Sequence, residues 1–386
     1  MGGVVKLEAD KIRTIGIRAG FLLAIIAMGI VAFRSSGGAY ESEGQPFSVE
    51  VIAQQEDVVW GFDFLPDGRI VFTERDGQLR ILDPSTRSVQ TVQGAPAVVQ
   101  AGQGGLLDVR VHPEFDKNGW IYLTYSEKAT HGMTTALGRG RLEGTELKDY
   151  RKLFSAFEPN GNNIHFGSRI EFDGAGKLFI SVGDRNERHN AQDLRYHNGK
   201  ILRLNEDGSA PVDNPFANNP DAKPEIWSYG HRNPQGLVKH PITGELWESE
   251  FGPRGGDEIN VIRPGANYGW PVITYGREYW GPKIGEGTEK AGMEQPVAYY
   301  VPSISPSGLA FYFGDAFPRW KGNLFVANLS GQHLRRLVID DNNKVVKQEE
   351  LLNDLGVNFR HVRTGPEGFL YFSTDDGKIA RLVPNL

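Results

Sequence analysis

The stretch WGFDFLPDGRIVFTE, residues 60–74, contains two apolar segments separated by a short turn at Pro66, Asp67 and Gly68. Apolar residues recur at alternate positions on both sides of the turn, a pattern typical of a β-hairpin. The same pattern returns five more times along the chain. The further copies are LLDVRVHPEFDKNGWIYLTY (106–125), SRIEFDGAGKLFISVGD (168–184), QGLVKHPITGELWESEFG (235–252), SGLAFYFGDAFPRWKGNLFVAN (307–328) and FRHVRTGPEGFLYFSTDDG (359–377). The chain therefore repeats one hairpin unit six times.

The spacing of these units predicts how they assemble. Their turn glycines lie about 46 to 78 residues apart, at Gly68, Gly119, Gly176, Gly244, Gly322 and Gly368. Units of this size predict an all-β fold with radial repetition, in which each hairpin belongs to one four-stranded blade of a six-bladed β-propeller. We expect the N- and C-terminal segments to meet in one blade and close the ring. A β-sandwich with long loops is the alternative architecture.

Composition narrows the classes of function. The chain has 386 residues with 48 Gly and 22 Pro, which favours many tight turns and short strands. Its net charge is −6 and no basic block dominates it beyond the N-terminus, so nucleic acid is not an expected partner. The absence of cysteine excludes disulfides, thiolate metal sites and cysteine nucleophiles.

The N-terminus has the composition of a targeting segment. Lys6, Lys11, Arg13 and Arg18 precede the apolar run AGFLLAIIAMGIVAF, residues 19–33. This run is shorter than the roughly 20 residues of a spanning helix, and its basic flank is typical of a secretory signal. Cleavage and retention as a membrane anchor both remain open, and a buried core helix is the less favoured reading.

These features predict two parts of the chain. Residues 1–45 are interpreted as a signal peptide or membrane anchor plus linker, and residues 46–386 as the propeller. We expect export to the periplasm or the extracellular space, with membrane contact only through an N-terminal anchor.

The segments between the hairpins carry polar groups that a propeller does not need. They are GQGGLL with Gln103, NGNNIHFGSR with His165, HRNPQGL with Arg232 and Asn233, EFGPRGGDEINVIRPGANYGWP with Asp257, Glu258 and Tyr268, YGREYWGP with Tyr279, and NFRHVR with Arg360 and Arg363. Each alone is explained by a turn, a strand cap, a surface ion pair or an acidic edge. Because each lies near a strand pair, we expect the propeller to bring them to one end of its channel.

The chemistry of this set indicates a ligand site. His165 is a candidate general base, because the usual pKa of histidine lies near neutrality. Arg232 and Arg360 suit carboxylates on a planar ligand, and the oxygen-rich GPRGGDE loop suits calcium. The chain has no GxGxxG opening a helix after a strand and no GxSxG elbow, so neither a dinucleotide fold nor a serine hydrolase is supported. A non-catalytic propeller that binds carbohydrate or protein, and a metal-dependent lactonase, remain alternatives.

Three motifs in order, GHRNPQGL, GPRGGDEIN and NYGWP, resemble the soluble quinoprotein sugar dehydrogenases, in the aldose sugar dehydrogenase branch of the glucose/sorbosone dehydrogenase family. The resemblance runs from about residue 47 to the C-terminus. It implies a six-bladed propeller that is exported, binds pyrroloquinoline quinone and calcium, and oxidises the C1 hydroxyl of aldose sugars to lactones. Hydride would pass to the quinone, and a separate acceptor would then remove the electrons.

The resemblance also implies roles for particular residues. His165 matches the catalytic base. The residues implied to line the active site or contact the quinone are Gln103, Arg232, Asn233, Tyr279 and Arg360. The residues implied to hold calcium are Gly252 and Pro253, through their carbonyl oxygens, together with Glu258 and Tyr268.

Two positions depart from the family pattern. Ile164 stands where the glucose-oxidising relatives have an acidic residue that contacts substrate, which puts a preference for glucose in doubt. Ser330 stands where they have a lysine on the quinone, which puts cofactor affinity and the activity in doubt. Gln332, His333 or Arg335 could compensate for the missing lysine.

Overall fold

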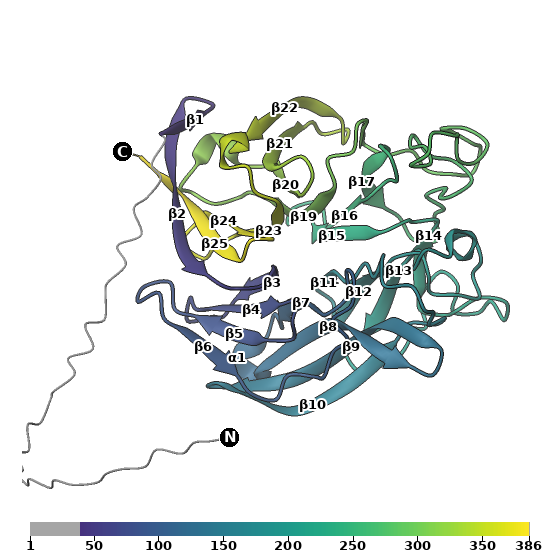
Figure 1. Ribbon diagram of the computed structural model, residues 1–386, viewed down its shortest axis with the longest axis horizontal. Coiled ribbons are helices and arrows are strands. Elements are labelled where there is room, and N and C mark those ends of the chain that lie inside the picture. The colour runs from purple at the N-terminus through teal and green to yellow at the C-terminus, as the bar shows by residue number, and fades with distance from the viewer. Residues whose placement is uncertain (1–38, 386) are drawn as a thin grey trace, which may run out of the picture. The chain divides into compact units, whose positions relative to one another are not determined.

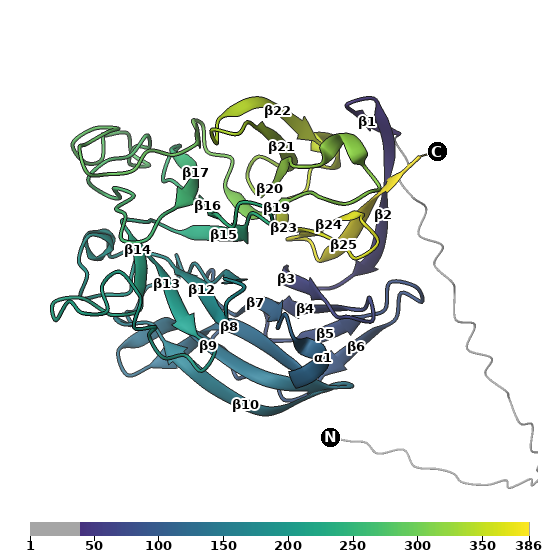
Figure 2. The ribbon, with the colours of Figure 1, turned by 180° about the vertical axis from the view of Figure 1, so that it is seen from behind.

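The computed structural model describes residues 39–385, which form an all-β, six-bladed propeller. Six antiparallel sheets surround a common centre, seen from opposite sides in Figures 1 and 2. The segment expected to be a signal peptide or anchor falls outside the described residues. Within residues 39–385, no helix is long and apolar enough to cross a membrane.

The blades follow one another along the chain. The first is β3 (Val59–Phe64), β4 (Ile70–Glu74), β5 (Leu79–Leu82) and β6 (Val89–Val92). The second is β7 (Leu106–Val111), β8 (Trp120–Ala129), β9 (Gly132–Glu143) and β10 (Glu146–Ser155), with the short helix α1 (Phe115–Asn118) between β7 and β8. The third is β11 (Ile170–Phe172), β12 (Lys177–Val182), β13 (Lys200–Asn205) and β14 (Ile226–Tyr229).

The remaining blades complete the ring. The fourth is β15 (Pro234–Lys239), β16 (Leu246–Glu250), β17 (Asp257–Ile262) and β18 (Ala298–Tyr300). The fifth is β19 (Pro306–Phe311), β20 (Leu324–Asn328), β21 (His333–Ile339) and β22 (Val345–Leu351). The sixth is β23 (Phe359–Thr364), β24 (Leu370–Thr374), β25 (Lys378–Pro384), β2 (Gln45–Gln54) and β1 (Tyr40–Ser42). Short 3-10 helices lie at Arg188–Ala191, Pro318–Trp320 and Asn353–Leu355.

The six predicted hairpins are the two inner strands of the six blades, so the prediction of a six-bladed propeller is confirmed. All six predicted turn glycines have positive φ, between 66° and 88°. A side chain strains this left-handed conformation, which explains why glycine recurs at that point of each unit. The rival sandwich is excluded, because no two of the sheets stack as an isolated pair in the ring of Figure 1.

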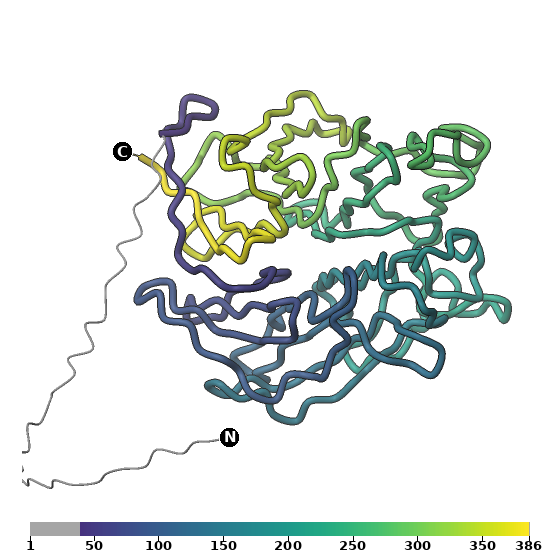
Figure 3. The backbone as a smooth tube through the Cα atoms, in the orientation of Figure 1, coloured from purple at the N-terminus to yellow at the C-terminus, as the bar shows by residue number. Residues whose placement is uncertain are grey.

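The sixth blade closes the ring with strands from both ends of the chain. β2 pairs antiparallel with β25, from Phe47 opposite Pro384 to Gln54 opposite Lys378. The purple β2 and the yellow β25 run side by side in Figure 3, as expected from the sequence. The first strand, β1, lies ahead of the expected boundary between residues 45 and 46, because it pairs with β2 as a fifth strand of this blade.

The core consists of apolar layers between neighbouring blades. Trp320 and Phe325 of the fifth blade pack with Phe47 and Leu370 of the sixth. Trp247 of the fourth blade packs edge-on against Phe311 of the fifth, with ring centroids 5.4 Å apart. Neighbouring blades therefore stabilise one another through these shared apolar layers.

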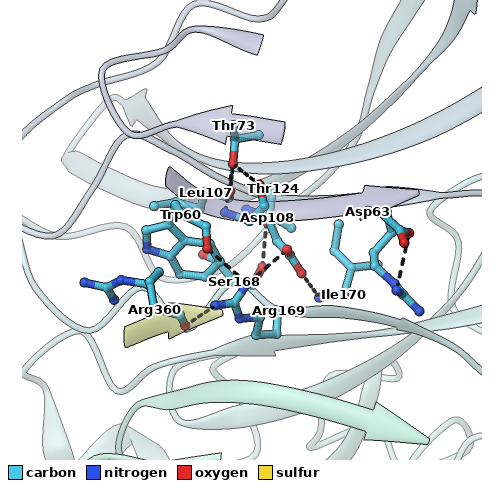
Figure 4. Close-up of polar contacts among 12 residues, drawn as sticks. Trp60, Asp63, Thr73, Leu107, Asp108, Thr124, Ser168, Arg169, Ile170 and Arg360 are labelled. Carbon is cyan, nitrogen blue, oxygen red and sulfur yellow. Dashed lines mark hydrogen bonds and ion pairs between the residues drawn. The ribbon is translucent and has the colours of Figure 1, made fainter. Parts of the chain in front are cut away.

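Arg169 ties the inner strands together at the centre of the propeller (Figure 4). Its guanidinium bonds to the carbonyl oxygens of Trp60 at 3.3 Å, Gln235 at 2.6 Å and Arg360 at 3.2 Å, and to the Asp108 carboxylate at 3.1 Å. These partners lie on or beside β3, β15, β23 and β7, and Arg169 itself directly precedes β11. Burial lowers the pKa of Arg169 to about 10, while Asp108 acts in the opposite direction. The side chain thus stays charged at neutral pH.

Replacing Arg169 with methionine should reduce the free energy of unfolding by about 3–5 kcal/mol, because it leaves Asp108 buried without its counter-charge. The control is Arg69→Met, which removes an arginine from an exposed pair with Asp67 and should cost at most about 1 kcal/mol. Denaturant unfolding of both variants and the parent measures the difference. Equal effects of the two substitutions would show that the hydrogen bonds of Arg169 to the inner strands do not stabilise the propeller more than an exposed ion pair does.

Candidate active site

One end of the channel is hollowed into a cavity of about 820 Å³. In each blade the predicted hairpin turn lies at one end, so the connection between the second and third strands and the link to the next blade lie at the other. Most of the cavity is built from these latter connections, and the long segment between β17 and β18 adds Arg277, Tyr279 and Gly281. His165 comes from the link between β10 and β11, Arg232 from that between β14 and β15, and Gly252 from the β16–β17 connection.

His165 is paired with a carboxylate that the sequence analysis did not identify. Its Nδ1 lies 2.6 Å from Oδ1 of Asp184, which directly follows the strand β12 and Gly183. The indole N–H of Trp270 donates to the other Asp184 oxygen at 2.8 Å. Asp184 is buried, and it holds Nδ1 as the donor, so that Nε2 of His165 is left as the basic nitrogen. Its only sequence signal was its place at the end of an inner strand.

The backbone around His165 is held in an unusual conformation. His165 has φ of +56°, which is uncommon for a residue with a side chain. Its N–H donates to Oε1 of Gln103 at 2.8 Å, and Arg185 donates to the carbonyl of the preceding Ile164. Gln103 therefore positions the histidine loop as well as lining the cavity.

Burial is the main influence on the pKa of His165 and lowers it below the usual 6.5. The hydrogen bond and charge of Asp184 favour the imidazolium and act in the opposite direction. Arg232 and Arg185 repel a further positive charge and add to the effect of burial. The neutral imidazole, which a general base requires, is thus favoured at neutral pH.

Arg232 and Asn233 are neighbours with different surroundings. The Arg232 guanidinium lines the cavity and donates from Nη1 to the carbonyls of Phe251 at 3.0 Å and Gly252 at 2.8 Å. Asn233 is fully buried behind the wall, where its Oδ1 accepts from the N–H of Gly167 at 3.2 Å. Its Nδ2 has no hydrogen-bond partner among the described residues. The cavity thus brings together Arg232 and His165, whereas Asn233 supports the loop that follows His165.

The cavity has a strongly positive lining. Arg232, Arg254 and Arg277 all line it, and no Asp or Glu does so among residues 39–385. Sequence reasoning singled out only Arg232, although GPRGG and YGREY each carry one of the other two. Three guanidinium groups without a counter-ion suit a ligand with several carboxylates. The lining also lacks the converging carboxylates that a metal-dependent lactonase would need.

Tyr279 and Arg360, both expected at the quinone, have different positions. Tyr279 lies at the rim of the cavity with 66% of its surface exposed. Arg360 is buried deeper in the channel, where Nε and Nη2 bond to the two oxygens of Asp375 at 2.7 and 2.9 Å. It lines a smaller adjoining pocket that shares Gln103 with the main cavity. The structure does not place Arg360 in the main cavity.

The expected calcium ligands are divided between two places. Gly252 and Pro253 line the main cavity, and Asp257 fixes their loop by accepting from the Gly252 N–H at 2.8 Å. Glu258 and Tyr268 line a small neighbouring pocket that also contains Gly252. The Tyr268 hydroxyl donates to the carbonyl of Val261 at 2.6 Å, so only its backbone oxygen is free to act as a ligand.

Ser330 lies in the cavity wall, and its Oγ is 2.8 Å from that of Ser305. None of the three residues considered as substitutes for the missing lysine lines the cavity. Gln332 approaches Asn358, His333 bonds to the Gly331 carbonyl, and Arg335 pairs with Glu350. The cavity receives its positive charge from Arg254 and Arg277 instead.

Comparison with known proteins identifies the family. The model of the family described as Glucose / Sorbosone dehydrogenase matches residues 56–381. The chain belongs to the glucose/sorbosone dehydrogenase family. This confirms the resemblance drawn from the three motifs and makes the chain an oxidoreductase of the sugar dehydrogenase type.

Individual members of the family are similar over most of their length. The aldose sugar dehydrogenase YliI of Escherichia coli strain K12 is 43% identical over 345 residues, which are 87% of this chain and 93% of that protein. The apo-form crystal structure of the soluble aldose sugar dehydrogenase from Escherichia coli matches with a TM-score of 0.85 at 41% identity, covering 88% of this chain and 100% of that chain. The PQQ-bound aldose sugar dehydrogenase of Streptomyces coelicolor matches with a TM-score of 0.72 at 26% identity, covering 88% and 98%.

Titration of the imidazole should give His165 a pKa below 6.5, and Asp184→Asn should lower that pKa further, because the substitution removes the charge that favours the imidazolium. NMR of labelled histidine side chains measures both values. The signals of His197, which pairs with Glu225 elsewhere, should not respond to Asp184→Asn. An unchanged or raised pKa of His165 in the variant would contradict the assigned pairing.

Proposed function

We propose that the chain is a quinoprotein dehydrogenase that oxidises the C1 hydroxyl of aldose sugars to lactones with pyrroloquinoline quinone. The observation that carries this proposal is the pairing of His165 with Asp184 at the wall of a cavity lined by three arginines and no acidic residue. A base kept neutral by burial and a cationic pocket for an anionic ligand are what such a reaction requires.

The residues present suit the quinone. It carries three carboxylates, and Arg232, Arg254 and Arg277 offer donors at different points of the wall. Tyr279 at the rim adds an aromatic face. When bound, the quinone supplies the two-electron acceptor for the hydride that leaves the sugar carbon.

The chain's own contribution to the chemistry is proton transfer. Nε2 of His165 takes the proton of the C1 hydroxyl as that carbon becomes a carbonyl. Asp184 holds the Nδ1–H and stabilises the imidazolium that forms, and Trp270 holds Asp184 from its other oxygen. Gln103 holds the histidine loop in place by accepting a hydrogen bond from the His165 N–H.

Calcium is the metal that the wall suits best. The carbonyl oxygens of Gly252 and Pro253 at the cavity and the carboxylate of Glu258 beside it are hard oxygen ligands, as is the Tyr268 backbone oxygen. A cation at Gly252 and Pro253 would act as a Lewis acid toward the quinone carbonyl. It would have to share the Gly252 carbonyl with Arg232.

The cellular setting is part of the proposal. The basic and apolar N-terminal segment supports export to the periplasm or beyond, either after cleavage or on an anchor. Each turnover leaves two electrons on the cofactor, so a separate electron acceptor is a required partner. Neither nucleic acid nor a further membrane contact is expected.

The alternative is a non-catalytic propeller that binds carbohydrate or protein. Ser330 in the cavity wall favours it, because the resemblance implies a lysine at this position in the glucose-oxidising relatives and serine is uncharged. Binding of the quinone is the property that distinguishes the two functions experimentally.

Reconstitution with pyrroloquinoline quinone and calcium should produce a protein that oxidises several aldoses with an artificial dye acceptor. Removing the metal with a chelator should abolish this activity, because the Lewis acid is lost, and added calcium should restore it. Dye reduction across a panel of aldoses is the measurement. Failure of the protein to bind the quinone would favour the non-catalytic alternative, and full activity after chelation would exclude a catalytic calcium.

His165→Ala should lower turnover by roughly 10²-fold or more, as expected when a general base is removed. Quinone affinity should remain close to that of the parent, since Arg232, Arg254 and Arg277 are unchanged. Turnover and quinone titration are measured side by side. Parental turnover would exclude the mechanism, whereas loss of both properties would assign His165 to cofactor binding or structure.

A further inference from the structure

His231, the first residue of the HRNPQGL segment, does not line the cavity. It is fully buried between the third and fourth blades, where its ring stacks on that of Tyr268 with centroids 4.7 Å apart. Its Nε2 lies 2.9 Å from Oγ of Ser228, and its Nδ1 lies 3.3 Å from Oε1 of Glu250. The serine holds one ring nitrogen, and the other faces a carboxylate.

A second buried carboxylate lies beside Glu250. Glu248 and Glu250 alternate on β16 and therefore point to the same face of the blade. Across the strand pair, Nδ2 of Asn260 donates to Oε2 of Glu248 at 3.2 Å. The other Glu248 oxygen, Oε1, is buried without any hydrogen-bond partner. On Glu250, the Arg232 N–H donates to Oε2 at 2.6 Å, which leaves Oε1 toward His231.

The ligand atoms of these three residues converge. One nitrogen of His231 and one oxygen from each of Glu248 and Glu250 all lie within 4.8 Å of one another, and all three side chains are buried. Among residues 39–385, neither glutamate forms an ion pair with a lysine or arginine. Two buried carboxylates need a counter-charge or a proton.

We propose that His231, Glu248 and Glu250 bind a divalent transition-metal ion of the zinc type between the third and fourth blades. Imidazole nitrogen together with carboxylate oxygen suits zinc, whereas calcium prefers oxygen ligands alone. Each ligand also has the outer partner that such sites need, because Ser228, Asn260 and the Arg232 N–H hold the atoms that do not face the centre.

This site adjoins the proposed calcium positions, which use the carbonyls of Gly252 and Pro253 and the side chain of Glu258. Glu250 lines the same small pocket as Glu258 and Tyr268, and Asn260 donates to both Glu248 and Glu258. The site proposed here differs in its ligands, because it adds the His231 nitrogen and the Glu248 carboxylate. The ion would join the link after β14 to the strand β16 and thereby fix the backbone of Arg232. Its role is structural, and the inference does not depend on quinone binding.

The test uses the full chain in calcium-saturated buffer, so that oxygen sites for calcium are already filled. After chelator treatment and re-equilibration with zinc, the parent should retain about one zinc per chain by elemental analysis, and zinc should raise its melting temperature. Glu248→Gln keeps the shape of the side chain but should weaken zinc retention at least tenfold and lose the zinc-dependent rise in melting temperature. The matched control is Glu225→Gln at the buried pair of His197 and Glu225, which lacks a second carboxylate and should leave zinc retention unchanged.

Two results would overturn the proposal. One is a parent that retains no zinc and shows no zinc-dependent rise in melting temperature, which would mean that Glu248 is protonated instead. The other is a Glu248→Gln variant that retains zinc like the parent, which would place the ion elsewhere. If Glu248→Gln does not fold, cobalt binding by the parent decides the matter. Visible absorption bands of a four- or five-coordinate ion with a histidine ligand support the site, and their absence excludes it.

Discussion

The buried guanidinium of Arg169 is the constraint on which the rest of the structure depends. It bonds to backbone or side-chain oxygens from β3, β7, β15 and β23 while standing at the start of β11. A ring of blades has no single core, because each apolar layer joins only two neighbours. One arginine at the centre therefore couples layers that otherwise do not touch. Its position four residues after His165 sets where the histidine loop leaves the channel.

The fold was largely predictable because its signals are local. Each inner hairpin carries recurring apolar residues on both sides of a glycine turn, because its strands are buried between neighbouring blades. The outer strands lack this signal. β22, for example, reads VVKQEEL and is mostly exposed, so nothing in its composition distinguishes it from a loop. β1 was missed for a related reason, since its three residues are a strand only because β2 lies beside them.

The sequence predicted which loops form the site, but it predicted fewer of the contacts between their side chains. Motif resemblance brought His165, Arg232, Gly252 and Pro253 to one cavity, and the structure agrees on their neighbourhood. Asp184 was not predicted, because two strands and a turn separate it from His165, and only the pairing of β12 with β11 brings the two together. Adjacent residues also need not share an environment, since Arg232 lines the cavity whereas Asn233 is fully buried behind its wall.

The HRNPQGL segment combines these separate environments in consecutive residues. His231 points into the interior between two blades, Arg232 into the cavity, and Asn233 into the wall behind the histidine loop. Glu250 connects the first two, since one of its oxygens faces His231 and the other accepts the N–H of Arg232. Whatever neutralises the buried carboxylates is thus one hydrogen bond away from the backbone that presents a cavity arginine. This loop is dense in hydrogen-bonding groups because its consecutive residues contact three different places: the interior between two blades, the cavity, and the wall behind the histidine loop.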